Sequence, residues 1–157
     1  MTDNKVKVGI TQGDINGISY EIIIKTLKDN RLLDFCIPVL YGSPKVLAYH
    51  RKAIDVENFS LISIAEAHEA KPKKACIINC HDDNIRVELG KATTYAGEAA
   101  YQAMEIAVKD LIDRQIDVLV TAPIDKHTIQ QKDFQFPGHT EYLQSRLEIK
   151  DTLMMMV

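Results

Sequence analysis

Residues 116–143, IDVLVTAPIDKHTIQQKDFQFPGHTEYL, decide the fold class because they compress a strand, a turn and two helix starts into one stretch. The apolar run at 116–120 has the length and β-branched content of a buried strand. Pro123 breaks that strand, Lys126 lies at the start of a helical pattern, and the polar residues 139–141 open a second helix. Ligands of open α/β sheets bind beyond the carboxyl ends of the strands, so we expect part of any active site here.

The same alternation of strand and helix runs through the rest of the chain. Hydrophobic patterning predicts strands at residues 6–10, 35–41, 59–64 and 74–80, and helices at residues 20–28, 44–52 and 95–114. No internal repeat, low-complexity tract or linker interrupts the pattern. We therefore predict an α/β fold with a mostly parallel sheet flanked by helices.

Local signals make the expectation more specific at the first two units. Ser19 is a candidate N-cap for the first helix, in which Ile22, Ile23 and Leu27 face inward. Pro38 lacks a ladder donor, which indicates an edge strand or a strand start.

The second and third helices carry their own start signals. Ser43 at the N-cap and Pro44 at the first helical position begin the second helix. We expect His50 to lie on that helix's surface or half-buried, and not to act as a ligand. Thr93 or Thr94 caps the longest helix. Its predicted buried stripe comprises Ala96, Ala99, Ala100, Ala103, Met104, Ala107, Leu111 and Ile112.

Residues 151–157, DTLMMMV, resemble the beginning of another buried strand. Domains rarely stop within a strand, because a further connection normally follows. We therefore expect the chain to be a piece of a longer protein.

Composition limits the classes of function. A chain of 157 residues fits one ordinary domain, with 46% hydrophobic and 26% charged residues. The net charge of -3 argues against a nucleic-acid partner, and the basic run at 71–74 is typical of a solvated turn. Neither a membrane span of about 20 apolar residues nor a signal peptide is evident, so we expect a cytoplasmic location and no membrane partner.

The three cysteines leave two interpretations open. Cys76 and Cys80 would point to the same face of a strand, and His81 follows them, so a metal site is conceivable. Buried reduced thiols, Cys36 included, are the simpler interpretation, because no second ligand pair is evident. The polar loop at 81–84 reads as a turn, since it lacks the alternation of a calcium loop.

The glycine turn at residues 12–17, QGDING, also allows two interpretations. Gly13 and Gly17 would let the backbone approach an anion at a helix N-terminus. The glycines do not match the dinucleotide fingerprint, and no phosphate-binding lysine follows. A tight strand-to-helix turn explains the same residues.

Four motifs together resemble one known family. They are residues 9–14 (GITQGD) with Gly17 and Ile18, residues 90–100 (GKATTYAGEAA), residues 121–126 (TAPIDK) and residues 136–141 (FPGHTE). In order and spacing they are similar to motifs of the 4-hydroxythreonine-4-phosphate dehydrogenase family of vitamin B6 (pyridoxal phosphate) biosynthesis. The resemblance extends over essentially the whole chain.

The resemblance implies a fold like that of isocitrate and isopropylmalate dehydrogenases, and an N-terminal part of a larger two-domain subunit. On that plan residues 1–136 form most of the first α/β domain. Residues 137–157 begin the second domain, which carries dimer contacts and metal ligands in the family. A homodimer is implied for the whole protein.

The resemblance also implies an activity, namely the NAD-dependent oxidation and decarboxylation of 4-phosphohydroxy-L-threonine with a divalent metal ion. Zinc, magnesium or cobalt would polarise the substrate hydroxyl, held by histidines beyond this chain. Two alternatives stay open. A related dehydrogenase would act on phosphothreonate or phosphoerythronate, and a non-catalytic fragment would bind a phosphorylated metabolite or assemble. The isolated chain is expected to be inactive.

Residue by residue, the resemblance assigns substrate contacts to His139 and Thr140. From the residues alone, Thr140 could instead be an N-cap and His139 a surface residue. Lys126 could neutralise substrate charge, assist proton transfer as a weak catalytic candidate, or be an exposed helix lysine. Glu141 is explained as a first-turn acid, and His127 is assigned no role. No cofactor-binding residue and no metal ligand is assigned.

The chain departs from the family at the glycine turn. The family commonly has Pro after Gly-Asp and then Gly-Ile-Gly-Pro-Glu, whereas residues 13–21 here read GDINGISYE. Two prolines and one glycine are absent, which puts the turn's rigidity and any close backbone approach at Ser19 in question. A divergent relative with another phosphorylated hydroxy-acid substrate would fit these changes.

Overall fold

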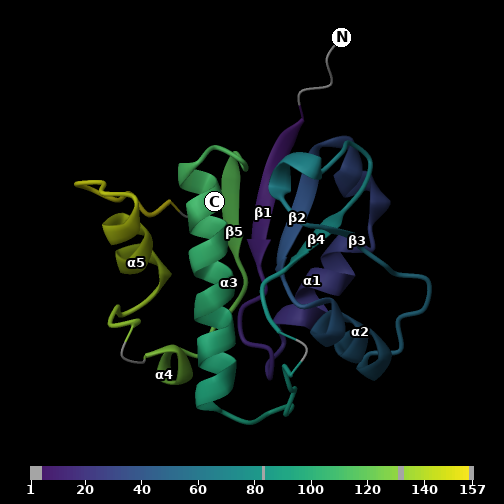
Figure 1. Ribbon diagram of the computed structural model, residues 1–157, viewed down its shortest axis with the longest axis horizontal. Helices are drawn as coiled ribbons and strands as arrows, with labels where there is room; N and C mark the ends of the chain where they lie inside the picture. The colour runs from purple at the N-terminus through teal and green to yellow at the C-terminus, as the bar shows by residue number, and fades with distance from the viewer. Residues whose placement is uncertain (1–4, 83, 131–132, 156–157) are drawn as a thin grey trace.

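The computed structural model describes residues 5–82, 84–130 and 133–155. Its elements are β1 (Val6–Thr11), α1 (Ser19–Leu27), η1 (Asn30–Asp34), β2 (Cys36–Gly42), α2 (Pro44–Ala53), β3 (Ile62–Ile64), η2 (Ala67–Glu69), β4 (Cys76–Asn79), α3 (Thr94–Ile112), β5 (Val118–Thr121), α4 (Lys126–Ile129) and α5 (His139–Arg146). The strands form a parallel sheet in the order β3-β4-β2-β1-β5 (Figure 1). The prediction of an α/β fold with a parallel sheet is confirmed.

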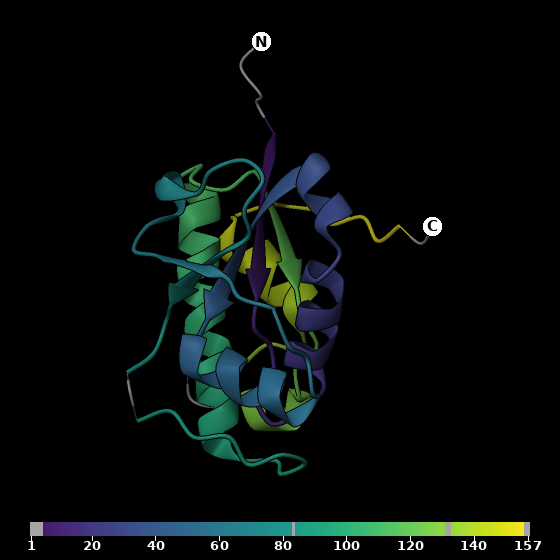
Figure 2. The same cartoon turned by 90° about the vertical axis from the view of Figure 1, so that its right-hand side faces the viewer.

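Helices cover both faces of the sheet, because the side chains of each strand alternate between the faces. Leu40 of β2 packs with the buried residues of α1 and α2. Its neighbours Val39 and Tyr41 pack instead with Ala103 and Ala107 of α3. Figure 2 shows α3 on one side of the strands and α1 on the other. The small side chains of α3 let its axis approach the sheet closely.

A third packing layer lies outside α3. Met104 and Val108 of α3 form a cluster with Ile129 of α4, Tyr142 of α5 and Phe134, which lies between those two helices in the sequence. Figure 1 shows α4 and α5 beside α3, on the side away from α1 and α2. Helix α3 is therefore the element that fixes the positions of α4 and α5 relative to the sheet.

Of the two expectations for Pro38, an edge strand or a strand start, the edge strand is wrong, because β2 lies between β4 and β1, and Pro38 is the third residue of β2. The carbonyl of Tyr41 accepts from Gln12 on the β1 side, and that of Gly42 accepts from Cys80 on the β4 side. By alternation, the backbone of Pro38 faces β4, whose pairing with β2 begins only at Val39. The missing N–H therefore falls where no ladder bond is required.

The buried strand predicted at 116–120 is instead the edge strand β5. Only β1 pairs with it in the described sheet, and Val118 and Val120 are 45% and 50% exposed. Residues 151–155, where another strand was expected, belong to no strand and are exposed. The other two predicted residues, 156 and 157, lie outside the described part. An apolar run alone does not say whether a neighbouring strand covers it, which explains both differences.

Helix α1 differs in its cap and its buried face. Its N-cap is Ile18, so Ser19 lies inside the helix and does not cap it. Ile22 is 43% exposed, whereas Tyr20 and Ile24 are fully buried. The true stripe runs through residues 20, 23, 24 and 27, which is the i, i+3, i+4, i+7 spacing of one helix face.

The later helix starts follow the sequence more closely. The side chain of Ser43 caps α2 by accepting from Val46, and Thr93 caps α3 by accepting from Ala96. His50 is buried rather than half-exposed, because its ring stacks on Tyr20 with ring centres 5.1 Å apart.

Further predicted elements are shorter or more exposed than expected. The strand expected at 59–64 is limited to Ile62–Ile64, and the one expected at 74–80 to Cys76–Asn79. Ile112, at the end of α3, is 50% exposed and outside the buried stripe. The basic run at 71–74 is exposed, as predicted. In the described residues no helix is both long and apolar enough to cross a bilayer.

Candidate functional site

The turns that follow β1 and β5 meet at the carboxyl edge of the sheet. The carbonyl of Pro123 accepts from the backbone N–H of Asp14 at 2.9 Å and from the hydroxyl of Ser19 at 2.7 Å. Gly13 lies in the first of these turns with a φ of +65°, and a Cβ at this position would collide with the Pro123 carbonyl. Glycine is required at 13 by both the backbone angle and the close approach.

The β1–α1 turn is a tight strand-to-helix connection, not an anion cradle. The N–H groups of Asn16 and Gly17 donate to the side chain and the carbonyl of Asp14. A phosphate would find these donors in use and a carboxylate beside them. Of the two interpretations of the glycine turn, the geometry therefore favours the tight turn, and these residues do not fit the pyrophosphate of a dinucleotide.

Two acidic residues, Asp14 and Asp125, lie in the paired turns, close enough for the charge of one to act on the other. Asp125 caps α4 by accepting from the N–H groups of His127 at 2.8 Å and Thr128 at 3.3 Å. Burial raises the pKa of Asp14, and the nearby charge of Asp125 raises it further, against the hydrogen bond from Asn16. Neither residue was predicted as a site residue, because 111 positions separate them in the sequence.

The structure brings Lys126 and His139 together, the first from α4 and the second from α5. A Cβ built on Gly138 would lie 3.8 Å from Cε and 4.0 Å from Nζ of Lys126, so the lysine passes directly beside the start of α5. Nε2 of His139 is buried and has no hydrogen-bond partner among the described residues. Burial lowers the pKa of His139, and the charge of Lys126 lowers it further. A neutral imidazole thus lies next to an ammonium group.

The remaining predicted residues lie around this pair. Thr140 is half-buried in the first turn of α5, and it is not an N-cap, because that position belongs to Gly138. Glu141 is a first-turn acid, as predicted. His127, which was assigned no role, is exposed. The start of α5 therefore carries the imidazole of His139 and the hydroxyl of Thr140, and the cation of Lys126 reaches it from α4.

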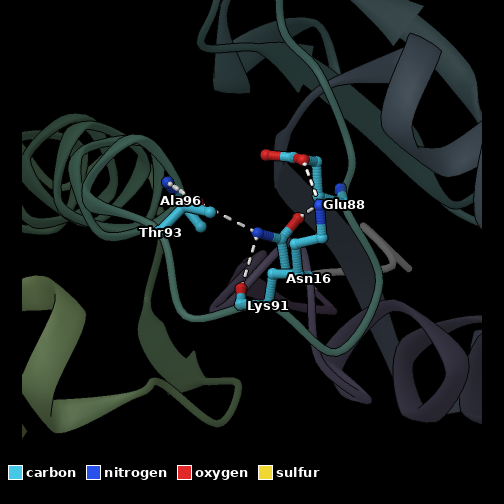
Figure 3. Close-up of polar contacts among 5 residues, drawn as sticks. All are labelled: Asn16, Glu88, Lys91, Thr93 and Ala96. Atoms are coloured by element: carbon cyan, nitrogen blue, oxygen red, sulfur yellow. Dashed lines mark hydrogen bonds and ion pairs between the residues drawn. The ribbon is translucent and has the colours of Figure 1, made fainter.

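Asn16 fastens the long loop between β4 and α3 to the β1–α1 turn (Figure 3). Its Oδ1 accepts from the N–H of Glu88 at 2.8 Å, and its Nδ2 donates to the carbonyl of Lys91 at 2.9 Å and to Oγ1 of Thr93 at 3.0 Å. Thr93 in turn accepts from Ala96 and caps α3. No short-range pattern in the sequence indicated this role, because the partners lie more than seventy positions away.

A second polar cluster, which the sequence analysis did not predict, lies where the loop between β4 and α3 begins. Gln12, fully buried, donates from Nε2 to the carbonyl of Ala99 at 3.0 Å and contacts Nε2 of His81 at 2.6 Å. Its Oε1 accepts from the hydroxyl of Tyr20 at 2.6 Å. Nδ1 of His81 lies 3.1 Å from Oε1 of Gln102. Tyr20, one of the departures from the family pattern, is thus part of a buried polar network.

The cysteine interpretation is decided by these surroundings. All three cysteines are free, and Cys76 is buried in β4. Burial raises the pKa of Cys80 to about 12, so its thiol is protonated and unreactive at neutral pH. Among the described residues no three histidine, cysteine or acidic side chains gather as a metal site. The residues present therefore do not fit a divalent metal ion.

Comparison with known proteins identifies relatives of the chain. The family described as "Pyridoxal phosphate biosynthetic protein PdxA" matches residues 34–157. A 4-hydroxythreonine-4-phosphate dehydrogenase of Bacteroides thetaiotaomicron is 53% identical over 148 residues, which are 94% of this chain and 40% of the relative. A Clostridium botulinum protein, provisionally named D-threonate 4-phosphate dehydrogenase, is 30% identical and covers 99% of this chain and 47% of its own length.

The fold also matches a solved structure. The crystal structure of a 4-hydroxythreonine-4-phosphate dehydrogenase from Burkholderia phymatum superposes with a TM-score of 0.82 at 27% identity. The match covers 95% of this chain and 46% of that one. The chain therefore spans less than half the length of each of these relatives.

Proposed function

The chain belongs to the PdxA family of pyridoxal phosphate biosynthetic proteins, and from that membership we propose that it is part of a dehydrogenase acting on 4-phosphohydroxy-L-threonine. The proposed reaction oxidises the substrate hydroxyl with NAD, assisted by a divalent metal ion, and then releases carbon dioxide from the resulting keto acid. Relatives named for the dehydrogenase, at 53% and 27% identity, support the substrate and the reaction type.

One observation supports a role of this chain's own residues in substrate binding, namely that Nε2 of His139, beside Lys126, is buried without a hydrogen-bond partner among the described residues. An unpaired buried nitrogen costs about 1–3 kcal/mol, so the imidazole gains by turning toward an incoming hydrogen-bond partner. The lysine supplies positive charge, and the start of α5 favours an anion. We propose that His139, Thr140 and Lys126 bind an anionic group of the substrate, its phosphate or carboxylate.

The chain's contribution is therefore binding and orientation. The described residues include no cluster that fits the metal ion, and the β1–α1 turn does not fit a dinucleotide, so neither NAD nor metal is assigned to them. Neutral His139 can donate one hydrogen bond, and Lys126 can hold a negative charge near it without proton transfer. Residues 1–136 as a first domain, residues 137–157 as the start of a second, a homodimer and a cytoplasmic location stay predictions.

A second substrate is favoured by a specific observation. The positions at which the sequence leaves the family pattern include Ser19 and Tyr20, and both are buried and hydrogen-bonded at the carboxyl edge. The 30% identical relative carries the name of a dehydrogenase for D-threonate 4-phosphate. That compound, a phosphorylated hydroxy acid without an amino group, is the alternative substrate.

The test is a turnover assay of the whole protein that contains this chain, with each of the two compounds, NAD and a divalent metal ion. NADH should form with 4-phosphohydroxy-L-threonine, and metal removal should abolish it. Preference for D-threonate 4-phosphate would establish the alternative. Normal turnover after complete metal removal would overturn the proposed mechanism.

A further inference from the structure

Side chains of the carboxyl edge hold the loop between β4 and α3 at two places of different chemistry, in addition to the backbone hydrogen bond from Cys80 to the carbonyl of Gly42. At residues 88–93 its partner is Asn16, an amide that does not titrate. At its other end the partner is Gln12, and the loop's contributor is His81, a half-buried imidazole. One attachment is therefore indifferent to pH, and the other involves the side chain that titrates nearest to neutrality.

The hydrogen-bond network fixes the orientation of the Gln12 amide. The carbonyl of Ala99 can only accept, so the group facing it must be the NH₂ of Gln12. The N–H of Ser43 donates to the Tyr20 oxygen at 3.0 Å, which leaves the Tyr20 proton for Oε1 of Gln12. The Ala99 carbonyl thus assigns the orientation of the amide, and the 2.6 Å contact with the Tyr20 hydroxyl agrees with it, although that hydroxyl also lies 3.5 Å from the carbonyl of Ser43.

The tautomer of His81 follows from that orientation. The second proton of the Gln12 NH₂ points at Nε2 of His81, so Nε2 must accept and carry no proton. Nδ1 then carries the ring proton and donates it to Oε1 of Gln102. Every donor in this hydrogen-bond network, which runs from Ser43 through Tyr20, Gln12 and His81 to Gln102, faces an acceptor only while His81 is neutral.

A proton added to His81 goes to Nε2 and places two donors face to face. Gln12 cannot resolve the conflict by turning over, because its oxygen would then face the Ala99 carbonyl, which can only accept. In the described part of the chain, the charged group that acts on His81 is Asp82, its neighbour in the loop, and its negative charge favours protonation. The groups that face the ring from α3 and from the β1–α1 turn are the neutral amides of Gln102 and Gln12.

We propose that the contact between Gln12 and His81 is a pH-sensitive latch, which holds the start of the β4–α3 loop to the end of β1 while His81 is neutral and releases it when His81 is protonated. Burial opposes the charged imidazole and lowers its pKa, so the latch is closed at neutral pH and opens on acidification. The Asn16 attachment keeps residues 88–93 in place in both states. The latch does not depend on the proposed activity.

The experiment is an NMR titration of the ¹⁵N-labelled chain from about pH 7.5 to about pH 4, a range that extends below an ordinary histidine titration because burial lowers the pKa of His81. At the upper end the His81 ring should show the Nδ1–H tautomer. As His81 titrates, the side-chain NH₂ signals of Gln12 should shift and their protons should exchange about tenfold faster after correction for intrinsic rates. The backbone amides of Glu88 and Gly90, bonded to Asn16, should keep their protection.

Three variants separate the latch from general acid effects. His81→Gln should abolish the pH response of the Gln12 side chain, whereas His68→Gln, at an exposed histidine, should leave it unchanged. Gln12→Glu supplies an acceptor for protonated His81 and should raise the pH at which His81 titrates. An Nε2–H tautomer at neutral pH, or a His81 titration to which the Gln12 amide does not respond, would overturn the proposal. The titration of the unmodified chain decides this even where a variant fails to fold.

Discussion

The hydroxyl of Ser19 donates to the carbonyl of Pro123 across 2.7 Å, and so joins two turns whose residues lie 104 positions apart in the sequence. The same carbonyl also accepts from the N–H of Asp14. Through this contact the β1–α1 turn fixes the segment that leads into α4, and hence the position of Lys126 relative to the sheet.

Replacing Ser19 with alanine should therefore lower the free energy of unfolding by about 1 kcal/mol, the usual net value of one buried hydrogen bond. Urea unfolding measures the change. Ser60→Ala, at an exposed serine, serves as the control and should shift stability by less than about 0.5 kcal/mol. Equal effects of the two substitutions would show that the Ser19 contact contributes nothing.

Gly97→Ala should destabilise the fold strongly, by about 3 kcal/mol, because a Cβ at that position of α3 would collide with the backbone of Thr128 in α4. Gly90→Ala is the matched control. Gly90 has a φ of +73° but no described atom within 4 Å of its Cβ position, so the cost there is backbone strain alone, about 1 kcal/mol. A Gly97 variant as stable as the Gly90 variant would contradict the close α3–α4 packing.

Acidification should destabilise the fold. Burial lowers the pKa of His50 and of His81 from the ordinary value of 6.5. Below about pH 6.5 the unfolded chain then binds more protons than the folded chain, so stability is complete above that pH and falls as the pH drops toward the folded-state values. Unfolding by urea at a series of pH values from about 8 to about 5 measures this slope.

The His50→Gln variant should show a flatter slope of stability against pH, because it removes one buried titrating group. His127→Gln, at an exposed position, should leave the slope unchanged. Stability that rises on acidification through this range would contradict the burial of both imidazoles.

Lys126→Met should raise the pKa of His139, since the lysine charge disfavours the imidazolium while burial of the ring is retained. NMR titration of the His139 ring measures it. Lys150→Met, at an exposed lysine, is the control and should have no effect. An unchanged His139 titration in the Lys126 variant would mean that the two side chains are not neighbours.

Elements with strong local signals were predicted correctly from the sequence. The Ser43–Pro44 start of α2 and the Thr93 start of α3 have capping side chains that bond to N–H groups three residues ahead, so nearby residues suffice. The parallel sheet followed from the alternation of strands and helices. The edge position of β5 did not, because burial of a strand depends on neighbours that its own residues do not specify.

The sequence supplied candidate residues for the site but not their arrangement. The positions of Lys126 and His139 were inferred from motifs, but their proximity depends on how α4 and α5 pack on α3. The network from Tyr20 through Gln12 to His81 was missed, because its members come from α1, from the end of β1 and from the loop after β4. His81 was interpreted as part of a polar turn, and nothing within a few residues of it indicates a buried partner.

The central claim is that His139 contacts the substrate, and steady-state kinetics of the His139→Ala variant in the whole protein test it most directly. The account predicts that kcat/KM for 4-phosphohydroxy-L-threonine falls about 100-fold or more, as for loss of a hydrogen bond to a charged group together with its positioning effect. His127→Ala, one residue from Lys126 and exposed, should keep the wild-type value. Unchanged kcat/KM in a correctly folded His139→Ala enzyme would remove His139 from the site and contradict the account.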